Sequence, residues 1–209
     1  MGHPVIVLPL LTGCMDAKSG KTGGTIDSNE SEREFAFMRK LGIKGKKKMS
    51  FASHVRFMRR AIELGRVGAL VKKTGGPFGA VVVKNGRIVG EGHNRVISGK
   101  DPSAHGEIVA IREACRKLKT YDLSGCTLYT SAECCSMCYS AAFWARIGRI
   151  YYAAQHGDAL RYGDFDDRVL EKEIRKNPGN RSPRCTPMLR KEALVIWKKF
   201  KKMPERARY

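Results

Sequence analysis

Apolar side chains first recur at helical spacing near residue 51. They lie three or four positions apart, with arginine and glutamate between them: Phe51, Val55, Met58, Ile62 and Gly65. A period of about 3.6 residues predicts an amphipathic helix with this apolar face packed on a core. The first regular element of the domain is therefore expected over 51–65.

Strand-like segments follow the helix breaker Gly75-Gly76-Pro77. The segments 80–84 and 87–90 flank Asn85-Gly86. Asn-Gly between two such segments favours the tight turn of a β-hairpin, because both turn residues need a positive φ. We therefore predict an antiparallel strand pair after the first helix.

Helical and strand-like patterns then alternate along the chain. Apolar positions follow helical spacing over 102–118 and 136–146, whereas 126–130 and 149–153 are rich in β-branched and aromatic residues. Helices that alternate with strands predict a sheet flanked by helices, an α/β fold.

Two short motifs at predicted helix starts carry candidate chemistry. His105 and Glu107 stand at one helix start, and Cys135 and Cys138 stand 30 residues later at the next. One imidazole and two thiolates give Zn²⁺ three protein ligands and leave its fourth position for water, as in catalytic zinc sites. Zinc lowers the pKa of such a water toward about 7, and Glu107 is close enough in sequence to move its protons.

Other arrangements of these side chains stay open from the residues alone. Cys134 and Cys138 form a C-x-x-x-C pair, so the spacing by itself does not select Cys135. The same cysteines could instead form a closed structural zinc site, or could simply be buried and free, and neither arrangement would be catalytic. A closed site needs a fourth side-chain ligand, and the sequence has no second C-x-x-C or paired histidine to supply one. An open site is therefore favoured.

The composition limits the cellular compartments and the partners that we expect for the protein. The chain has 209 residues and seven cysteines, and three of the seven lie within five positions. An odd, crowded set of cysteines suits metal binding better than disulfides and indicates a reducing, cytoplasmic compartment. No apolar segment approaches the roughly 20 residues of a membrane-spanning helix, so no membrane partner is expected.

Positive charge is concentrated near the C-terminus. Residues 168–209 carry 14 basic and 4 acidic side chains, which is half of the net charge of +20. Such a segment could attract RNA, nucleotide phosphates or an anionic surface, although solvated charge with no dedicated partner is the commoner explanation. The length fits one domain with appendages, and we expect a basic, flexible extension over 1–48, a zinc domain over 49–170 and a basic segment over 171–209.

The motifs resemble those of the cytidine-deaminase-like zinc hydrolases, and within them the guanine deaminases. The zinc motifs match the H-x-E and C-x-x-C signature of zinc nucleobase deaminases. The similarity runs from about residue 50 to about residue 170, and its most discriminating part is Phe165-Asp166-Asp167 with Lys172-Glu173-Ile174. The other similar segments are Gly76-Pro77-Phe78-Gly79-Ala80, Asn94-Arg95-Val96, Asp101-Pro102-Ser103-Ala104 and Phe143-Trp144-Ala145-Arg146.

The resemblance implies a three-layer α/β/α sandwich with a mixed central sheet, and one zinc ion per subunit held by His105, Cys135 and Cys138. It implies attack of zinc-bound hydroxide on C2 of guanine, which gives xanthine and ammonia in purine metabolism. Glu107 would take the water proton and return it to the base. It also selects Cys135, rather than Cys134, as the first sulfur ligand.

The resemblance assigns substrate contacts as well. Asn94 and Asp167 match positions that hydrogen-bond the base, and Phe78 and Trp144 match positions that line the pocket. Tyr209 is similar to a terminal tyrosine that closes the active site on a C-terminal lid exchanged between the subunits of a homodimer. The chain departs from the family pattern in having Gly106 for alanine, Cys134 for proline, and an extra residue near Asp164.

Three rival functions remain open. A tRNA adenosine deaminase shares the zinc motifs and the segment Arg146-Ile147-Gly148-Arg149-Ile150, and would explain the positive charge. A guanosine deaminase would differ in admitting ribose to the pocket. A non-catalytic RNA-binding subunit would keep the fold and the zinc, but it would have no need of Glu107.

Overall fold

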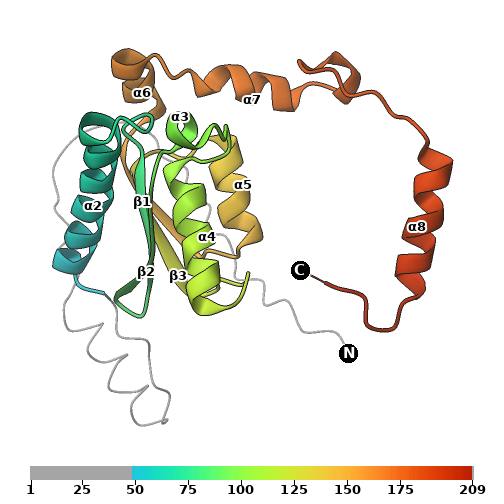
Figure 1. Cartoon of the computed structure of the whole chain (residues 1–209), viewed down its shortest axis with the longest axis horizontal. Helices are drawn as coiled ribbons and strands as arrows, with labels where there is room; N and C mark the ends of the chain where they lie inside the picture. The colour runs from blue at the N-terminus through green and yellow to red at the C-terminus, as the bar shows by residue number, and fades with distance from the viewer. Residues whose placement is uncertain (1–48, 209) are drawn as a thin grey trace, which may run out of the picture. The chain divides into compact units, whose positions relative to one another are not determined.

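A mixed four-stranded sheet forms the centre of the computed structural model, which describes residues 49–208 (Figure 1). The strand order is β2-β1-β3-β4, with β1 antiparallel to both β2 and β3, and β3 parallel to β4. The strands are β1 (Gly79–Lys84), β2 (Arg87–His93), β3 (Cys126–Ala132) and β4 (Arg149–Ala154). The expected extension over 1–48 and the terminal Tyr209 lie outside the described residues.

Helices cover both faces of the sheet. The helix α2 lies on one face, and α4 and α5 lie on the other, which confirms the expected three-layer α/β/α fold (Figure 1). The helical elements are α2 (Phe51–Arg66), its π-helical continuation η1 (Val67–Val71), α3 (Val96–Gly99), α4 (Gly106–Leu118), α5 (Ser136–Trp144), α6 (His156–Gly163), α7 (Asp167–Arg175), η2 (Pro178–Asn180) and α8 (Arg190–Lys202).

Strand alternation divides the core into two sets of side chains. Val81 and Tyr129 pack with Phe57 beneath α2, whereas Val82 and Leu128 pack beneath α4 and α5. Neighbouring strand residues point to opposite faces, so one central sheet supplies both layers. Burying each large apolar side chain contributes about 1.5–3 kcal/mol, which makes the central strands rigid supports for the loops at their ends.

The helix over 51–65 is confirmed, but its predicted buried face is partly wrong. Phe51 is 82% exposed, and the fully buried positions are Phe57, Ala61 and Gly65. A Cβ on Gly65 would lie 2.6 Å from the carbonyl oxygen of Pro77. The helix therefore lies so close to the segment around Pro77 that small residues occupy the contact. The spacing of large apolar residues does not reveal such a contact.

The predicted hairpin is present between β1 and β2. Asn85 and Gly86 have φ values of 50° and 74°, and both signs match the type I′ turn that Asn-Gly favours. The other predicted elements, over 102–118, 126–130, 136–146 and 149–153, also occur, within a few residues at their ends.

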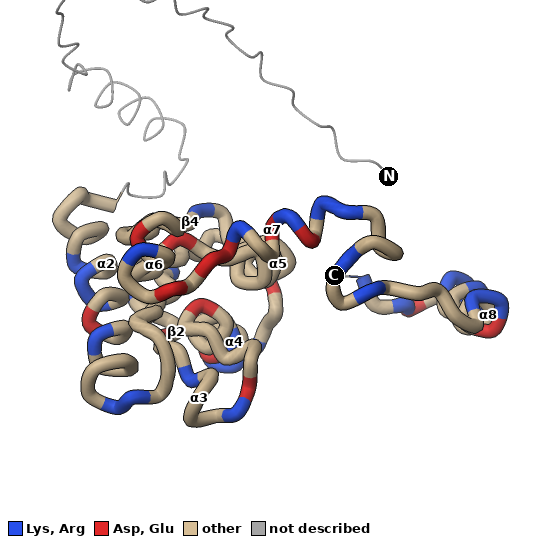
Figure 2. Tube along the Cα trace, turned by 90° about the horizontal axis from the view of Figure 1, so that it is seen from above, with Lys and Arg blue, Asp and Glu red and all other residues tan. Residues whose placement is uncertain are grey.

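The C-terminal elements lie beyond the sheet in sequence, and the expected domain boundary at residue 170 falls inside α7. The helix α8 has basic residues near both of its ends, marked blue in Figure 2, and a run of apolar residues between them that includes the exposed Ile196 and Trp197. The hydroxyl of Tyr121 donates a hydrogen bond of 3.1 Å to the carbonyl oxygen of Arg208. Within residues 49–208, no helix combines the length and apolar character needed to cross a membrane.

Candidate active site

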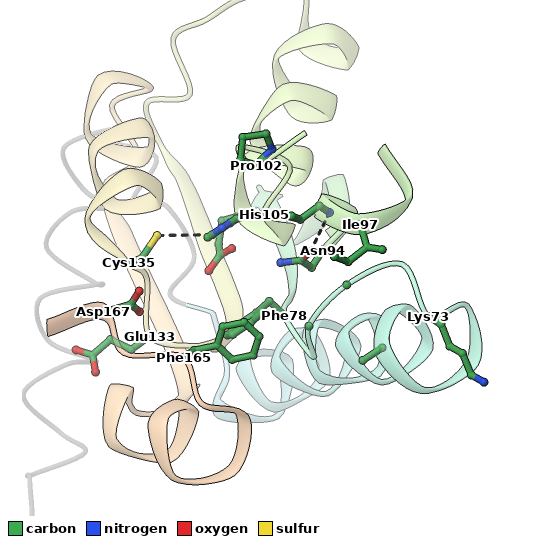
Figure 3. Close-up of a pocket in the computed structure, with 15 residues that line it drawn as sticks. Lys73, Phe78, Asn94, Ile97, Pro102, His105, Glu133, Cys135, Phe165 and Asp167 are labelled. Atoms are coloured by element: carbon green, nitrogen blue, oxygen red, sulfur yellow. Dashed lines mark hydrogen bonds between the residues drawn. The ribbon is translucent and has the colours of Figure 1, made fainter. Parts of the chain in front are cut away.

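Two helix starts bring three possible metal ligands together. His105 caps α4 and Cys135 caps α5, and both residues have extended backbone that turns the chain into the helix. The Nδ1 atom of His105 lies 3.6 Å from Sγ of Cys135 and 3.5 Å from Sγ of Cys138. All three ligand atoms lie within 4.8 Å of one another. The contact between His105 and Cys135 is visible in Figure 3.

These separations fit a tetrahedral zinc ion. Bonds of about 2.1 Å to nitrogen and about 2.3 Å to sulfur place tetrahedral ligands about 3.6 Å apart. Cys134 does not belong to this group of ligand atoms, and its thiol packs against apolar side chains of the core. The geometry therefore favours Cys135 and Cys138 as the sulfur pair.

The surroundings of the Cys135 thiol favour the thiolate form that binds metal. A hydrogen bond from Cys138, and another from His105, lower the pKa of Cys135 to about 4, even though burial opposes ionisation. The hydrogen bond to Cys135 raises the pKa of Cys138 because that thiol is the donor of the pair. The unpaired amide groups at the start of α5 also stabilise negative charge. These surroundings favour the thiolate form of Cys135, which is the form that binds metal.

Glu107 lies beside these ligands in the first turn of α4. Its side chain is only 3% exposed, its Oε1 accepts a 3.0 Å hydrogen bond from the Thr130 hydroxyl, and its Oε2 lies 3.5 Å from Sγ of Cys138. Burial raises the pKa of Glu107 above its ordinary value. A buried carboxyl whose pKa moves toward neutrality is suited to accept and return a proton.

A cavity of about 400 Å³ opens over these groups, and several predicted site residues line it (Figure 3). The ring of Phe78 is nearly parallel to that of His105, with an interplanar angle of 9° and centroids 6.5 Å apart. Aromatic faces of this kind give a planar ring a surface on which to stack. The predicted site residues in the lining are Phe78, Asn94, His105, Glu107, Cys135 and Asp167.

Asn94 presents a defined hydrogen-bonding group to the cavity. Its Oδ1 accepts a 3.0 Å hydrogen bond from the backbone amide of Val96, and its amide nitrogen points into the cavity (Figure 3). A Cβ on Gly75 would lie 2.0 Å from the same Oδ1. Asn94 is thus held by a local turn and by a glycine that leaves it room, which orients the NH₂ group as a donor.

Only one acid of the Asp166-Asp167 pair faces the cavity. Asp166 is the N-cap of α7, and its carboxylate binds the side chain of Arg168 at 2.7 Å. Asp167 lines the cavity, in Figure 3 on the same side as Cys135 and Glu133. Burial raises the pKa of Asp167, because the cavity wall removes solvent from its carboxylate. The cavity therefore holds an acceptor in Asp167 and a donor in Asn94.

One predicted site residue, Trp144, does not line this cavity, and one other is not described by the structure. Trp144, the last residue of α5, is 62% exposed and lines a separate surface pocket beside Phe143. Tyr209 lies outside the described residues. The predicted roles of both remain predictions.

The structure also adds residues that sequence reasoning missed. Phe165 contacts Phe78 edge-to-face at a centroid distance of 5.0 Å, Glu133 lines the cavity, and Thr130 positions Glu107. Phe165 belongs to the Phe165-Asp166-Asp167 segment, and Glu133 stands two residues before Cys135. Their proximity to these motifs is the sequence signal that could have revealed them. Thr130 has no such signal, because its partner is 23 residues away.

Comparison with known proteins places these features among zinc deaminases. Residues 52–154 match the cytidine and deoxycytidylate deaminase zinc-binding region. A guanine deaminase of Bacillus subtilis is 49% identical over 124 residues, which cover 59% of this chain and 78% of that protein. A tRNA-specific adenosine deaminase of Aquifex aeolicus is 38% identical over 125 residues, which cover 58% of this chain and 77% of that protein.

Solved structures show the same likeness. An X-ray structure of guanine deaminase from Bacillus subtilis aligns with a TM-score of 0.71 and 42% identity, covering 75% of this chain and 98% of that chain. A structure of guanine deaminase from Nitrosomonas europaea aligns with a TM-score of 0.50 and 33% identity, covering 68% and 81% respectively.

Proposed function

Because the chain belongs to the cytidine and deoxycytidylate deaminase zinc-binding family, we propose that it hydrolyses guanine to xanthine and ammonia. The observation that carries this proposal is the cavity in which His105, Cys135 and Cys138 converge beside the buried carboxyl of Glu107. The resemblance of the Phe165-Asp166-Asp167 segment to guanine deaminases, and the 49% identity to one of them, support guanine as the substrate.

The residues of the chain divide the work of the reaction. Zinc held by His105, Cys135 and Cys138 would supply Lewis-acid activation of a water molecule at neutral pH. Glu107 takes one proton from the attacking water and delivers it to a ring nitrogen. It then takes the second proton from the new hydroxyl group on C2 and delivers it to the leaving amine. One water is consumed, the C2–N bond breaks, and ammonia leaves. Glu107 ends the cycle in the protonation state in which it began.

The polar groups of the cavity favour guanine over adenine. Guanine presents N–H donors at N1 and at its 2-amino group, whereas adenine presents a lone pair at N1. The carboxylate of Asp167 accepts hydrogen bonds from the N–H groups of guanine and repels the N1 lone pair of adenine. The NH₂ group of Asn94 donates to an acceptor of the base. A site built around buried polar groups discriminates strongly against a base that leaves them unpaired.

A substrate panel tests this function. We expect ammonia from guanine, with much slower release from guanosine, adenine, cytosine and tRNA, and we expect Asp167→Asn to reduce the preference for guanine over adenine. The variant Asp166→Asn is the matched control, because that carboxylate binds Arg168 instead of facing the cavity. Conversion of tRNA adenosine to inosine with no turnover of guanine would establish the alternative function.

The tRNA alternative has one specific feature in its favour, the basic C-terminal segment. Binding to phosphates weakens steeply as salt rises, whereas turnover of a neutral base barely responds. We expect guanine turnover to be nearly independent of salt. An RNA affinity that falls steeply with salt would support a second, nucleic-acid partner for residues 171–209.

We also propose a homodimer in which residues 171–209 are exchanged and Tyr209 closes the partner's cavity. The exposed apolar side chains of α8 support this, since Ile196 is 71% and Trp197 is 66% exposed. Light scattering should give the mass of two chains, and deletion of Tyr209 should slow guanine turnover without lowering the melting temperature. Unchanged kinetics would contradict the proposed lid role of Tyr209.

The crowded free cysteines support a reducing, cytoplasmic location.

A further inference from the structure

His156 takes no part in the mechanism above, yet it lies where three functional segments meet. Its Nε2 atom is 3.3 Å from the carbonyl oxygen of Cys134 and 3.7 Å from Oδ2 of Asp167. Its Nδ1 atom is 4.0 Å from Oε1 of Glu171, and its backbone amide donates to Oε2 of Glu133 at 3.3 Å. One residue at the start of α6 thus contacts the loop before Cys135 and the first turns of α7.

The position of Asp167 depends on few other contacts. No residue of α7 is buried, so apolar packing does little to hold this helix against the domain. Asp166, which caps α7, forms its ion pair with Arg168 of the same helix rather than with the body of the protein. A segment with few buried apolar contacts opens at a low cost in free energy, so the polar contacts that it makes matter for its position. The His156 ring is such a contact, since it is only 25% exposed and faces both Asp167 and Glu171.

We propose that His156 is a positioning residue that ties Asp167 to the zinc-binding loop and so sets the selection of guanine. The Nε2–H group donates to the carbonyl oxygen of Cys134, which fixes the plane of the ring. The same edge of the ring then faces the Asp167 carboxylate and limits where that carboxylate can lie. The effect on guanine selection rests on the proposed function, but the contact between His156 and Asp167 does not depend on it.

The charges around Asp167 agree with this role. Burial, and then the nearby Cys135, raise the pKa of Asp167, and His156 acts in the opposite direction. The imidazole therefore opposes the effect of burial and favours the ionised, hydrogen-bond-accepting form of the Asp167 carboxylate. An ionised Asp167 is the form that distinguishes the N1–H group of guanine from the N1 lone pair of adenine.

Replacement of His156 tests the proposal. We expect His156→Leu to retain zinc and to lower kcat/KM for guanine by about 10- to 100-fold, mostly through a higher KM, because small displacements of a substrate-orienting group have effects of this size. His156→Gln, which keeps an N–H donor near the Nε2 position, should recover most of the loss. In an Asp167→Asn background, His156→Leu should have little further effect, because the residue through which it acts has already been changed.

The control is Asp158→Ala in the same helix. Asp158 accepts from the backbone amide of Gln155 at 2.9 Å and belongs to the capping box of α6, but it does not line the cavity. This variant should lower the melting temperature at least as much as His156→Leu while leaving kcat/KM for guanine unchanged. Equal kinetic losses in both variants would show a merely structural role and overturn the proposal, as would loss of zinc from His156→Leu.

A second measurement separates this inference from the proposed function. Backbone amides of residues 167–170 should exchange hydrogen faster in His156→Leu than in the unmodified protein, and should be unaffected in Asp158→Ala. If guanine is not a substrate, the exchange result still shows whether His156 holds the start of α7. Unchanged exchange at 167–170 would overturn the positioning role, whatever the enzyme acts on.

Discussion

Glu107→Gln separates proton transfer from metal binding more sharply than any other single change. The substitution replaces one carboxylate oxygen with an NH₂ group and keeps the shape of the side chain. Oε1 of the glutamine can still accept the hydrogen bond from Thr130, which is 3.0 Å long in the structure. The three ligand atoms of the metal site are untouched. The variant should therefore fold and bind zinc.

The expected kinetic effect follows from the number of proton transfers that Glu107 performs. Each general acid–base step contributes about 10²- to 10⁴-fold, and Glu107 both accepts and returns the proton. We expect kcat for guanine to fall at least about 10³-fold, which corresponds to about 4 kcal/mol of activation free energy. The free energy of unfolding should not fall, because burial raises the pKa of Glu107 and glutamine removes the cost of burying that charge.

The assay combines ammonia release with zinc content and thermal melting. Glu113→Gln is the matched control, since Glu113 belongs to the same helix and its carboxylate accepts from the backbone amide of Glu91 at 2.8 Å, away from the cavity. That control should keep full activity. Ammonia release by Glu107→Gln within tenfold of the unmodified rate would refute the proton-transfer role, and loss of its zinc would refute the separation of the two functions.

Two further predictions follow from local geometry. Gly75→Ala should raise KM for guanine about tenfold, because its Cβ would lie 2.0 Å from Oδ1 of Asn94 and displace that side chain. The control Gly148→Ala, which has no atom within 4 Å of its new Cβ, should leave KM unchanged. Equal kinetics in the two variants would contradict the role of Asn94. Burial raises the pKa of Tyr129 from its ordinary value of 10 to about 12, so its stabilising effect should be complete below about pH 10 and disappear as pH rises through about 12. Melting curves across this range should show a smaller alkaline loss in Tyr129→Phe, and an identical loss in both proteins would contradict the assignment.

Much of the architecture was predictable because its signals are local. The Asn85-Gly86 turn needs two positive φ values, and the sequence places there the residues that adopt them most readily. The alternation of helices and strands follows from apolar periodicity within single elements. The zinc motifs are local in the same sense, since each lies within four consecutive residues at a helix start.

Contacts between distant segments were not predictable in this way. The buried face of α2 includes the small residues Ala61 and Gly65. A Cβ on Gly65 would meet the carbonyl of Pro77, and only the packed structure brings that carbonyl close. Apolar character alone assigned Phe51 to the core, although it is 82% exposed. Close backbone approach and side-chain exposure are properties of two segments together, so one segment cannot reveal them.

The same division holds within the active site. The sequence by itself determined the α/β class, a zinc site of His105 with neighbouring cysteines, and the adjacent Glu107, because each depends on residue type and short spacing. The choice of Cys135 over Cys134 came from the resemblance, and the geometry favours it. The tertiary structure places Asp167, which the resemblance had assigned to the base, on the cavity and Asp166 away from it. Only the tertiary structure shows that His156 meets Asp167 from a different helix. Such choices depend on how α6 and α7 are placed against the loop before Cys135, and no local propensity encodes that placement.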